Sequence, residues 1–228
     1  MAQTVTLSSL RTQARQRADM ENSNFISDSE LNGYINSSYA ELYDILVTTF
    51  ADYYITNSEL TISSGNDIPV PSDFYKLRGV DYQLSTNEWI NLYKFNFERR
   101  NSKNRDTIRT YRGEPTRQYR LLGSNITIEP EDQATGTYRV WYVPNYTKLS
   151  DDTDTVDGVN GWEEYIVIDA AIKMALKEES DIQGLLIQKG AILKRITDAS
   201  NERDVGEPET IADTQTDLYY DDALWNRY

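Results

Sequence analysis

Apolar residues recur at helical spacing near the start of the chain. A helix is predicted from residue 6 to about residue 20, because four small or apolar side chains fall on one side of it: Leu7, Leu10, Ala14 and Ala18. A second start signal is Ser27-Asp28-Ser29-Glu30, a capping box in which the serine hydroxyl and the glutamate each satisfy a free backbone amide. An apolar stripe continues from it to about Tyr54, so two helices are expected here.

The apolar period changes to that of β-strands in the middle of the chain. Residues 59–62 form one short run, and residues 119–122 and 126–128 flank Gly123-Ser124, which predicts a hairpin. Residues 137–143 alternate, with one face formed by Tyr138, Val140 and Tyr142 and the other by Arg139, Trp141 and Val143. Residues 55–150 are therefore predicted to form a small, mostly antiparallel β module.

Helical spacing returns at Trp162. Residues 165–176 are apolar on nearly every side, so this helix should be central in the fold. Ser180 and Gln183 form a second capping box, which predicts a last helix to about Asn201. Because glycine weakens a helix by about 1 kcal/mol, we expect close helix packing at Gly184 and Gly190, which lie inside this segment.

These patterns predict an α+β protein. Residues 1–54 and 151–203 form a helical body from the N- and C-terminal helices, and residues 55–150 are inserted between them. Residues 204–228 show no regular period and are predicted to be an extended C-terminal arm.

The composition excludes several kinds of chemistry. The chain has no cysteine and no histidine, which removes disulfides, cysteine-rich zinc sites, cysteine nucleophiles and serine–histidine hydrolysis. We see no secretory signal and no run long enough to span a membrane. We expect no catalytic site, no metal, no cofactor and no membrane partner.

Two acidic features leave alternatives open. Residues 152–163 have the length of an EF-hand loop, but Val156 and Asp157 stand where a ligand and a glycine are required, which favours a solvated turn over a calcium site. Asp169 is the one acid in the apolar helix. Pairing with Lys173 one turn later is favoured over a general base with a raised pKa. A carboxylate hydrolase centred on either feature has no support from residue spacing.

Three groups of residues resemble head-to-tail adaptor (connector, or head completion) proteins of tailed bacteriophages. They are residues 29–36 (SELNGYIN) with 41–44 (ELYD), residues 170–173 (AAIK) with 177–181 (KEESD), and residues 201–204 (NERD) with the acidic tail that follows. The resemblance spans both helical ends, and the β module is only loosely similar. It implies a ring, usually of twelve subunits, in the virion neck, assembled in the host cytoplasm. Such a ring joins the portal protein to tail or nozzle proteins and lines a passage through which DNA moves without specific binding.

The C-terminal arm fits the role that this resemblance implies. It carries seven acidic residues and one basic residue, yet its apolar residues are bunched at the end: Leu218, Tyr219, Tyr220, Leu224, Trp225 and Tyr228. We expect these side chains to bind the portal. The alternative is an arm that folds back on its own subunit.

One basic segment interrupts a chain whose net charge is −14. Residues 94–120 hold nine basic and three acidic side chains, and the basic ones include Arg99, Arg100, Lys103, Arg105, Arg109 and Arg112. We favour contact with the acidic surface of a neighbouring subunit, because a channel that DNA slides through should not grip phosphates. The alternative is a DNA-binding accessory protein that uses residues 94–120.

Overall fold

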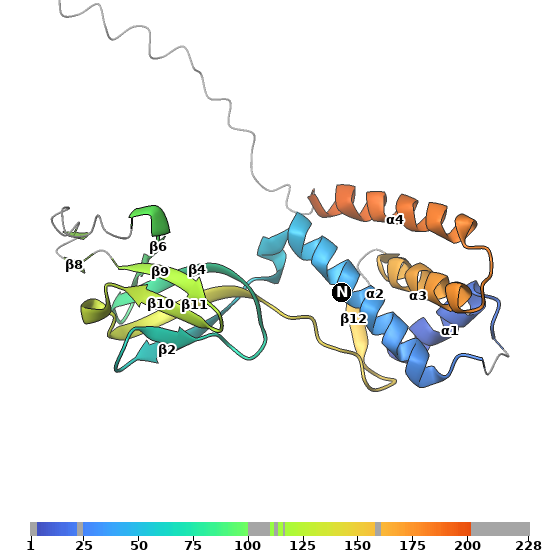
Figure 1. Ribbon diagram of the computed structural model, residues 1–228, viewed down its shortest axis with the longest axis horizontal. Coiled ribbons are helices and arrows are strands. Elements are labelled where there is room, and N and C mark those ends of the chain that lie inside the picture. The colour runs from blue at the N-terminus through green and yellow to red at the C-terminus, as the bar shows by residue number, and fades with distance from the viewer. Residues whose placement is uncertain are drawn as a thin grey trace, which may run out of the picture.

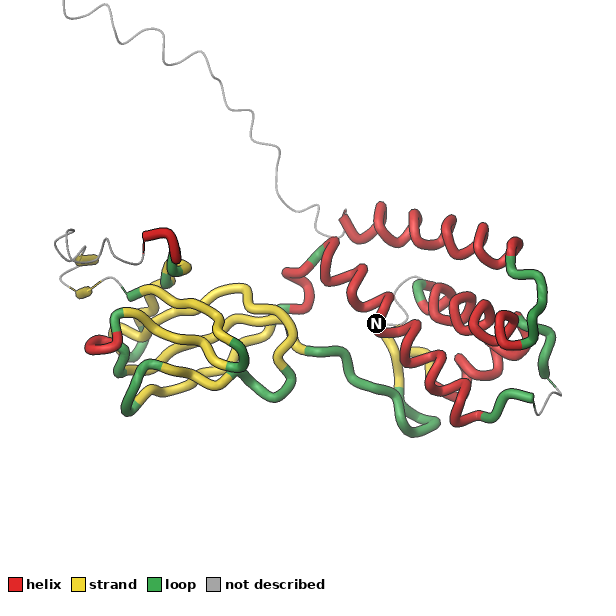
Figure 2. Tube along the Cα trace, viewed as in Figure 1, coloured by secondary structure: helices red, strands yellow, loops and turns green. Residues whose placement is uncertain are grey.

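The computed structural model describes residues 4–21, 25–99, 110–111, 114–115, 117–157 and 161–201. Within these residues the fold is α+β, as predicted, with the α-helices gathered at one end of the molecule and most strands at the other (Figures 1 and 2). The expectations for residues 202–228 and for most of the basic residues of the segment 94–120 lie outside the described residues.

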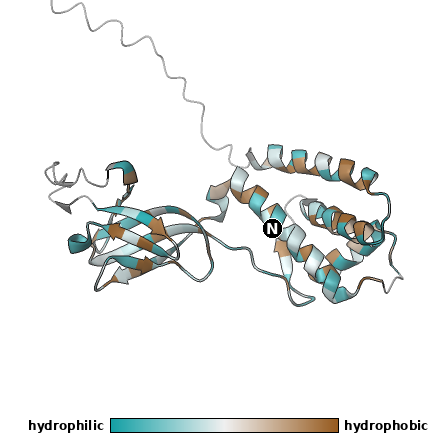
Figure 3. Ribbon diagram, viewed as in Figure 1, coloured by the Kyte–Doolittle hydropathy of each residue, from teal (hydrophilic) through white to brown (hydrophobic). Residues whose placement is uncertain are grey.

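The helical end is built from segments that are distant in the sequence. Its helices are α1 (Leu7–Arg17), α2 (Asp28–Thr49), the short 3-10 helix η1 (Ala51–Tyr54), α3 (Glu163–Lys177) and α4 (Gln183–Asn201). Strand β1 (Thr4–Thr6) pairs antiparallel with β12 (Thr155–Asp157), which ties the start of the chain to the segment before α3. Helix α3 is central, since ten of its residues are buried, and Figure 3 colours it largely hydrophobic.

The first two helices begin where the sequence predicts. Thr6 Oγ1 accepts a hydrogen bond from the Ser9 amide, and Ser27 Oγ accepts one from the Glu30 amide, both at 3.2 Å. These side chains satisfy amides that have no partner inside the helix. The glutamate of the capping box is used differently: the Glu30 carboxylate binds Lys177 at 2.7 Å and Tyr34 at 2.7 Å.

Two prediction errors concern the last helix. The Gln183 amide donates to Asp181 Oδ1 at 3.0 Å, while the Ser180 hydroxyl binds Glu178, so the aspartate and not the serine satisfies the first turn. The expected close packing at Gly184 and Gly190 is also wrong, because a Cβ built at either glycine would meet no atom within 4 Å. Both glycines are exposed.

The β end is a sandwich of two four-stranded sheets. One sheet has the order β3-β10-β9-β6 and the other the order β2-β11-β4-β5. The strands are β2 (Thr56–Ile62), β3 (Asp67–Pro69), β4 (Phe74–Ser85), β5 (Glu88–Asn91), β6 (Tyr93–Lys94), β9 (Gln118–Leu122), β10 (Asn125–Glu129) and β11 (Gly136–Pro144). A separate two-stranded piece joins β7 (Thr110–Tyr111) to β8 (Glu114–Pro115). The predicted hairpin is β9–β10, and Gly123 in its turn has a φ of 55°.

Strand β11 passes from the sandwich core to the helical end. Tyr138, Val140 and Tyr142 are buried on one face, as the alternation predicts. Val143, which the alternation groups with Arg139 and Trp141, is fully buried in a cluster with Tyr43 and Val47 of α2, whereas Arg139 and Trp141 are half-buried. The register with β4 shifts between Trp141 and Tyr142, and a β-bulge of this kind re-aims the residues that follow it.

Candidate interaction sites

Asp169 of α3 lies at the centre of a buried ionic cluster. Its carboxylate is 2.7 Å from Lys173 Nζ and 2.7 Å from Lys189 Nζ, and it accepts a hydrogen bond of 2.6 Å from Ser38 Oγ. The predicted pairing with Lys173 is therefore confirmed. Burial opposes the charged form, but the hydrogen bonds from the two lysines and the serine outweigh it and hold the pKa of Asp169 below its ordinary value. A general base with a raised pKa is the wrong reading of this residue.

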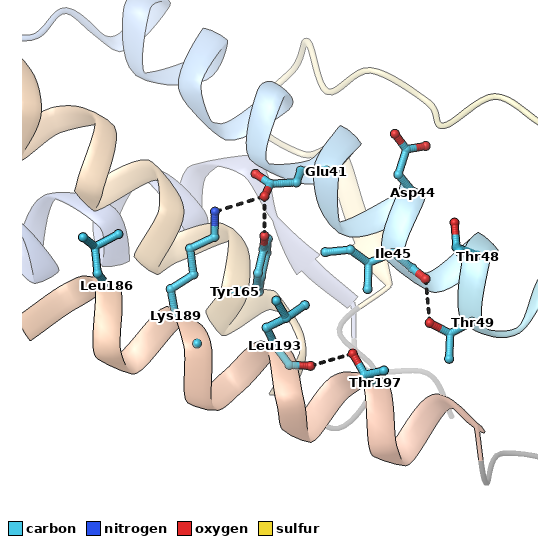
Figure 4. Close-up of a pocket in the computed structure, with 11 residues that line it drawn as sticks. Glu41, Asp44, Ile45, Thr48, Thr49, Tyr165, Leu186, Lys189, Leu193 and Thr197 are labelled. Carbon is cyan, nitrogen blue, oxygen red and sulfur yellow. Dashed lines mark hydrogen bonds and ion pairs between the residues drawn. The ribbon is translucent and has the colours of Figure 1, made fainter.

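The cluster extends to the surface between α2 and α4 (Figure 4). Glu41 Oε1 accepts from Lys189 Nζ at 3.0 Å and from the Tyr165 hydroxyl at 2.7 Å. Burial and the bond to Glu41 raise the pKa of Tyr165. For Lys189, burial favours the neutral amine, but the bonds to Asp169 and Glu41 prevail and raise its pKa. Each charge is neutralised by a partner, so the cluster fastens α4 to α2 and α3.

A groove of about 720 Å³ runs over this cluster between α2 and α4. Its apolar floor is formed by Ile45, Leu186 and Leu193, and Glu41 and Asp44 stand on the α2 side. We call it the helix groove. Leu186 and the neighbouring Ile187 are 48% and 75% exposed, so apolar surface continues along α4 beyond the groove.

A second groove, of about 540 Å³, lies where α2 meets the β sandwich. We call it the junction groove. It is lined by Val47 and Thr48 of α2, by Ala51 of η1, by Tyr75, Lys76, Leu77 and Arg78 of β4, and by Lys94, Tyr119, Leu121 and Val143. Two interactions beside it join the two ends of the molecule: Arg78 pairs with Asp52 and the Tyr75 hydroxyl donates to Asp44. The sequence patterns did not indicate this groove, because its lining comes from five separate segments.

Two acids of the loop before β12 have structural partners. Asp154 Oδ2 accepts from the amides of Ser150 and Asp151 at 2.7 and 2.9 Å, which lowers the pKa of Asp154. Asp152 pairs with Arg11 of α1. These contacts agree with a turn more than with calcium ligation, and no cluster of metal-ligating side chains occurs within the described ranges.

The structure places only part of the basic segment. Arg99 ends the 3-10 helix η2 (Phe97–Arg99), and the other five basic residues predicted to make contacts lie outside the described part of the chain. Of the remaining basic residues, Arg117 is buried, donates to the Gln133 carbonyl at 2.6 Å and lies 3.8 Å from the Tyr82 ring centroid. Arg120 pairs with Glu129 at 3.2 Å. Arg117 and Arg120 therefore support the sandwich itself.

All six aromatic and apolar residues predicted to bind the portal also lie outside the described residues. Among the helices that the structure describes, none is long and apolar enough to cross a membrane. A family model matches the chain over residues 5–212, and its description is SU10 adaptor protein. A search of curated proteins finds no match.

Proposed function

Because this chain belongs to the SU10 adaptor protein family, we propose that it is a structural subunit of a ring that joins the portal of a phage capsid to the tail and lines the DNA passage. The observation that carries the proposal is the extent of the family match. Residues 5–212 include every described helix and strand except the first residue of β1. Family membership identifies the chain as a phage adaptor protein. Its assembly into a ring, its location in the neck of the virion and its lining of the DNA passage are proposed.

The surface of the molecule supports a role in contacts between proteins. Large apolar side chains are exposed at both ends: Phe25, Leu176, Leu186 and Ile187 at the helical end, and Tyr93, Phe97, Leu121 and Leu122 on the sandwich. Exposed apolar patches of this kind mark interaction sites. The ionic cluster around Asp169 has every charge paired and supports no catalytic role.

In this proposal the C-terminal arm docks on the portal through its aromatic residues, and the basic segment contacts a neighbouring subunit. Residues 204–228 bring six apolar anchors to a partner, each able to contribute roughly 1.5–3 kcal/mol when buried. The acidic surface of one copy suits the arginines of the next, while DNA passes without specific binding.

Native mass spectrometry of the protein alone, of the portal alone and of the mixture tests this function. With a net charge of −14, copies repel one another at low salt, so we expect a monomer alone and a ring of copies on the portal. Stable rings of the isolated protein across salt concentrations, or no portal complex, would contradict the proposal. Retention of the protein on DNA at physiological salt would favour the accessory DNA-binding role.

A further inference from the structure

The junction groove has a charge that is opposite to that of the chain around it. Three of its lining residues are basic, Lys76, Arg78 and Lys94, and none is acidic, in a protein whose net charge is −14. Arg78 is paired with Asp52. The exposed Lys94 and the half-buried Lys76, whose Nζ lies 4.8 Å from the centroid of the Tyr75 ring, leave positive charge at the groove. Anionic segments are therefore attracted to this site.

The rest of the lining is apolar or aromatic. Leu77, Leu121 and Val143 supply aliphatic surface, with Leu121 43% exposed, and Tyr75 and Tyr119 supply rings. A ligand that suits the groove combines negative charge with aromatic or aliphatic side chains. Such side chains would cover the exposed leucine while the acids approach the lysines.

We propose that the junction groove binds residues 217–228 of the same chain. This segment reads DLYYDDALWNRY, with three acids, one base and six apolar or aromatic side chains besides Ala223. The segment and the groove are complementary in composition. The acids of the segment lie opposite Lys76 and Lys94, and its rings or leucines lie opposite the apolar lining.

The position of the last helix places the segment within reach. Helix α4 ends at Asn201, and Thr197 in its last turns lines the helix groove together with Thr48 of α2. Thr48 also lines the junction groove, so the two grooves adjoin at the end of α2. Figures 1 and 4 show the end of α4 beside the end of α2. Residues 202–217 extend to as much as roughly 50 Å, and the two grooves share the lining residue Thr48.

The helix groove is the nearer recess, but it suits the segment less well. Its lining holds two acids, Glu41 and Asp44, and one base, Lys189, which is already paired with Glu41 and Asp169. The lining of the junction groove holds three bases and no acid, and the acids beside it, Asp44 and Asp52, are bound to Tyr75 and Arg78. An acidic segment therefore meets less like charge in the junction groove.

Groove binding gives the arm a resting state before it docks on the portal, a role that rests on the proposed function. The residues proposed to bind the portal are the same ones that occupy the groove, so portal docking competes with groove binding. An arm held in its own groove cannot engage a second subunit, and the portal then acts by displacing it.

A paramagnetic label on the full-length protein tests the inference. The chain has no cysteine, so Ala223→Cys gives a single site for a nitroxide label. We expect the label to remove the amide signals of Lys76, Leu77 and Leu121, equally at low and high protein concentration. The signals should return in the variant Lys76→Glu/Lys94→Glu. The matched control Lys148→Glu/Lys194→Glu changes two exposed lysines outside the groove and should leave the signal loss unchanged.

Three results would overturn the inference: no signal loss at the junction groove, loss at Leu186 and Leu193 of the helix groove instead, or loss that grows with protein concentration, which would indicate a second copy. Portal binding by the unlabelled wild type is measured separately. If the protein binds the portal but shows no paramagnetic effect, only the binding of the arm to the junction groove is rejected. If it shows the paramagnetic effect but does not bind the portal, only the proposed function is rejected.

Discussion

Removing the carboxylate of Asp169 should destabilise the protein and release α4 first. The side chain is 6% exposed and binds Lys173, Lys189 and Ser38. In Asp169→Ala the two ammonium groups lose their shared anion and the serine hydroxyl loses its acceptor. Breaking a buried ion pair from one side costs about 3–5 kcal/mol.

The expected value lies at the lower end of that range. The side chains of Lys173 and Lys189 are 26% and 21% exposed, so both ammonium groups can turn toward water once the partner is gone. We expect Asp169→Ala to lower the free energy of unfolding by about 3 kcal/mol, which is a large part of a typical 5–15 kcal/mol. In a Lys189→Met background the loss should shrink, with a coupling of about 1–2 kcal/mol.

Urea unfolding followed by circular dichroism measures this change, and amide hydrogen exchange shows where it acts. Helix α4 should lose protection before α3, because only Ile196 and Ser200 are buried among its described residues. The control Asp198→Ala removes an exposed acid from α4 and should change the free energy of unfolding by no more than about 0.5 kcal/mol. Equal unfolding midpoints for wild type and Asp169→Ala would refute the role given to the ionic cluster.

The free energy of unfolding should also depend on pH through Asp169. Because the folded pKa of Asp169 lies below its ordinary value, its contribution is fully present above about pH 4 and is lost as pH falls through the folded pKa. The stability difference between wild type and Asp169→Asn should therefore be constant near neutral pH and should shrink below about pH 4. A difference that grows on acidification would contradict the assigned direction.

Three further predictions concern the core and the proposed contacts. Ile172→Asp buries an unpaired charge on the central helix and should cost several kcal/mol; wild-type melting of this variant would contradict the architecture. Reversing Arg99, Arg100 and Lys103 to glutamate should weaken assembly on the portal while DNA affinity stays low, and a gel-shift assay showing lost DNA binding with intact assembly would favour the accessory DNA-binding role. Deleting every residue after Ala212 should abolish portal docking, measured by co-sedimentation, because all six apolar anchors are removed.

The elements that local chemistry determines were predictable from the sequence. Ser27 begins α2 through its own hydroxyl, and Tyr138 and Val140 face the core because side chains alternate along a strand. Lys173 was predictable as the partner of Asp169, since residues four apart share one face of a helix. In each case the interaction lies within one element.

The remaining features depend on how separate elements meet. Lys189 reaches Asp169 from another helix, and no periodicity places two residues twenty positions apart in contact. Val143 is buried because β11 meets α2 beyond a bulge. Ser180 has the spacing of a capping residue, but the chain turns so that Asp181 reaches the amide first. The junction groove is assembled from several segments and has no signature in any of them.

At the helical end, β1 pairs with β12 and the first two helices pack against the last two, so the β module between them is the loop that this packing closes. More than one hundred residues separate α2 from α3, yet both helices contribute to one hydrophobic core. The entropy lost on closing a flexible loop grows only as the logarithm of its length, by about 0.6 kcal/mol for each doubling. The closed helical end can therefore accept a β sandwich of very different size between the same two helices. Related chains that keep this closure should vary most in the length of the segment between α2 and β12.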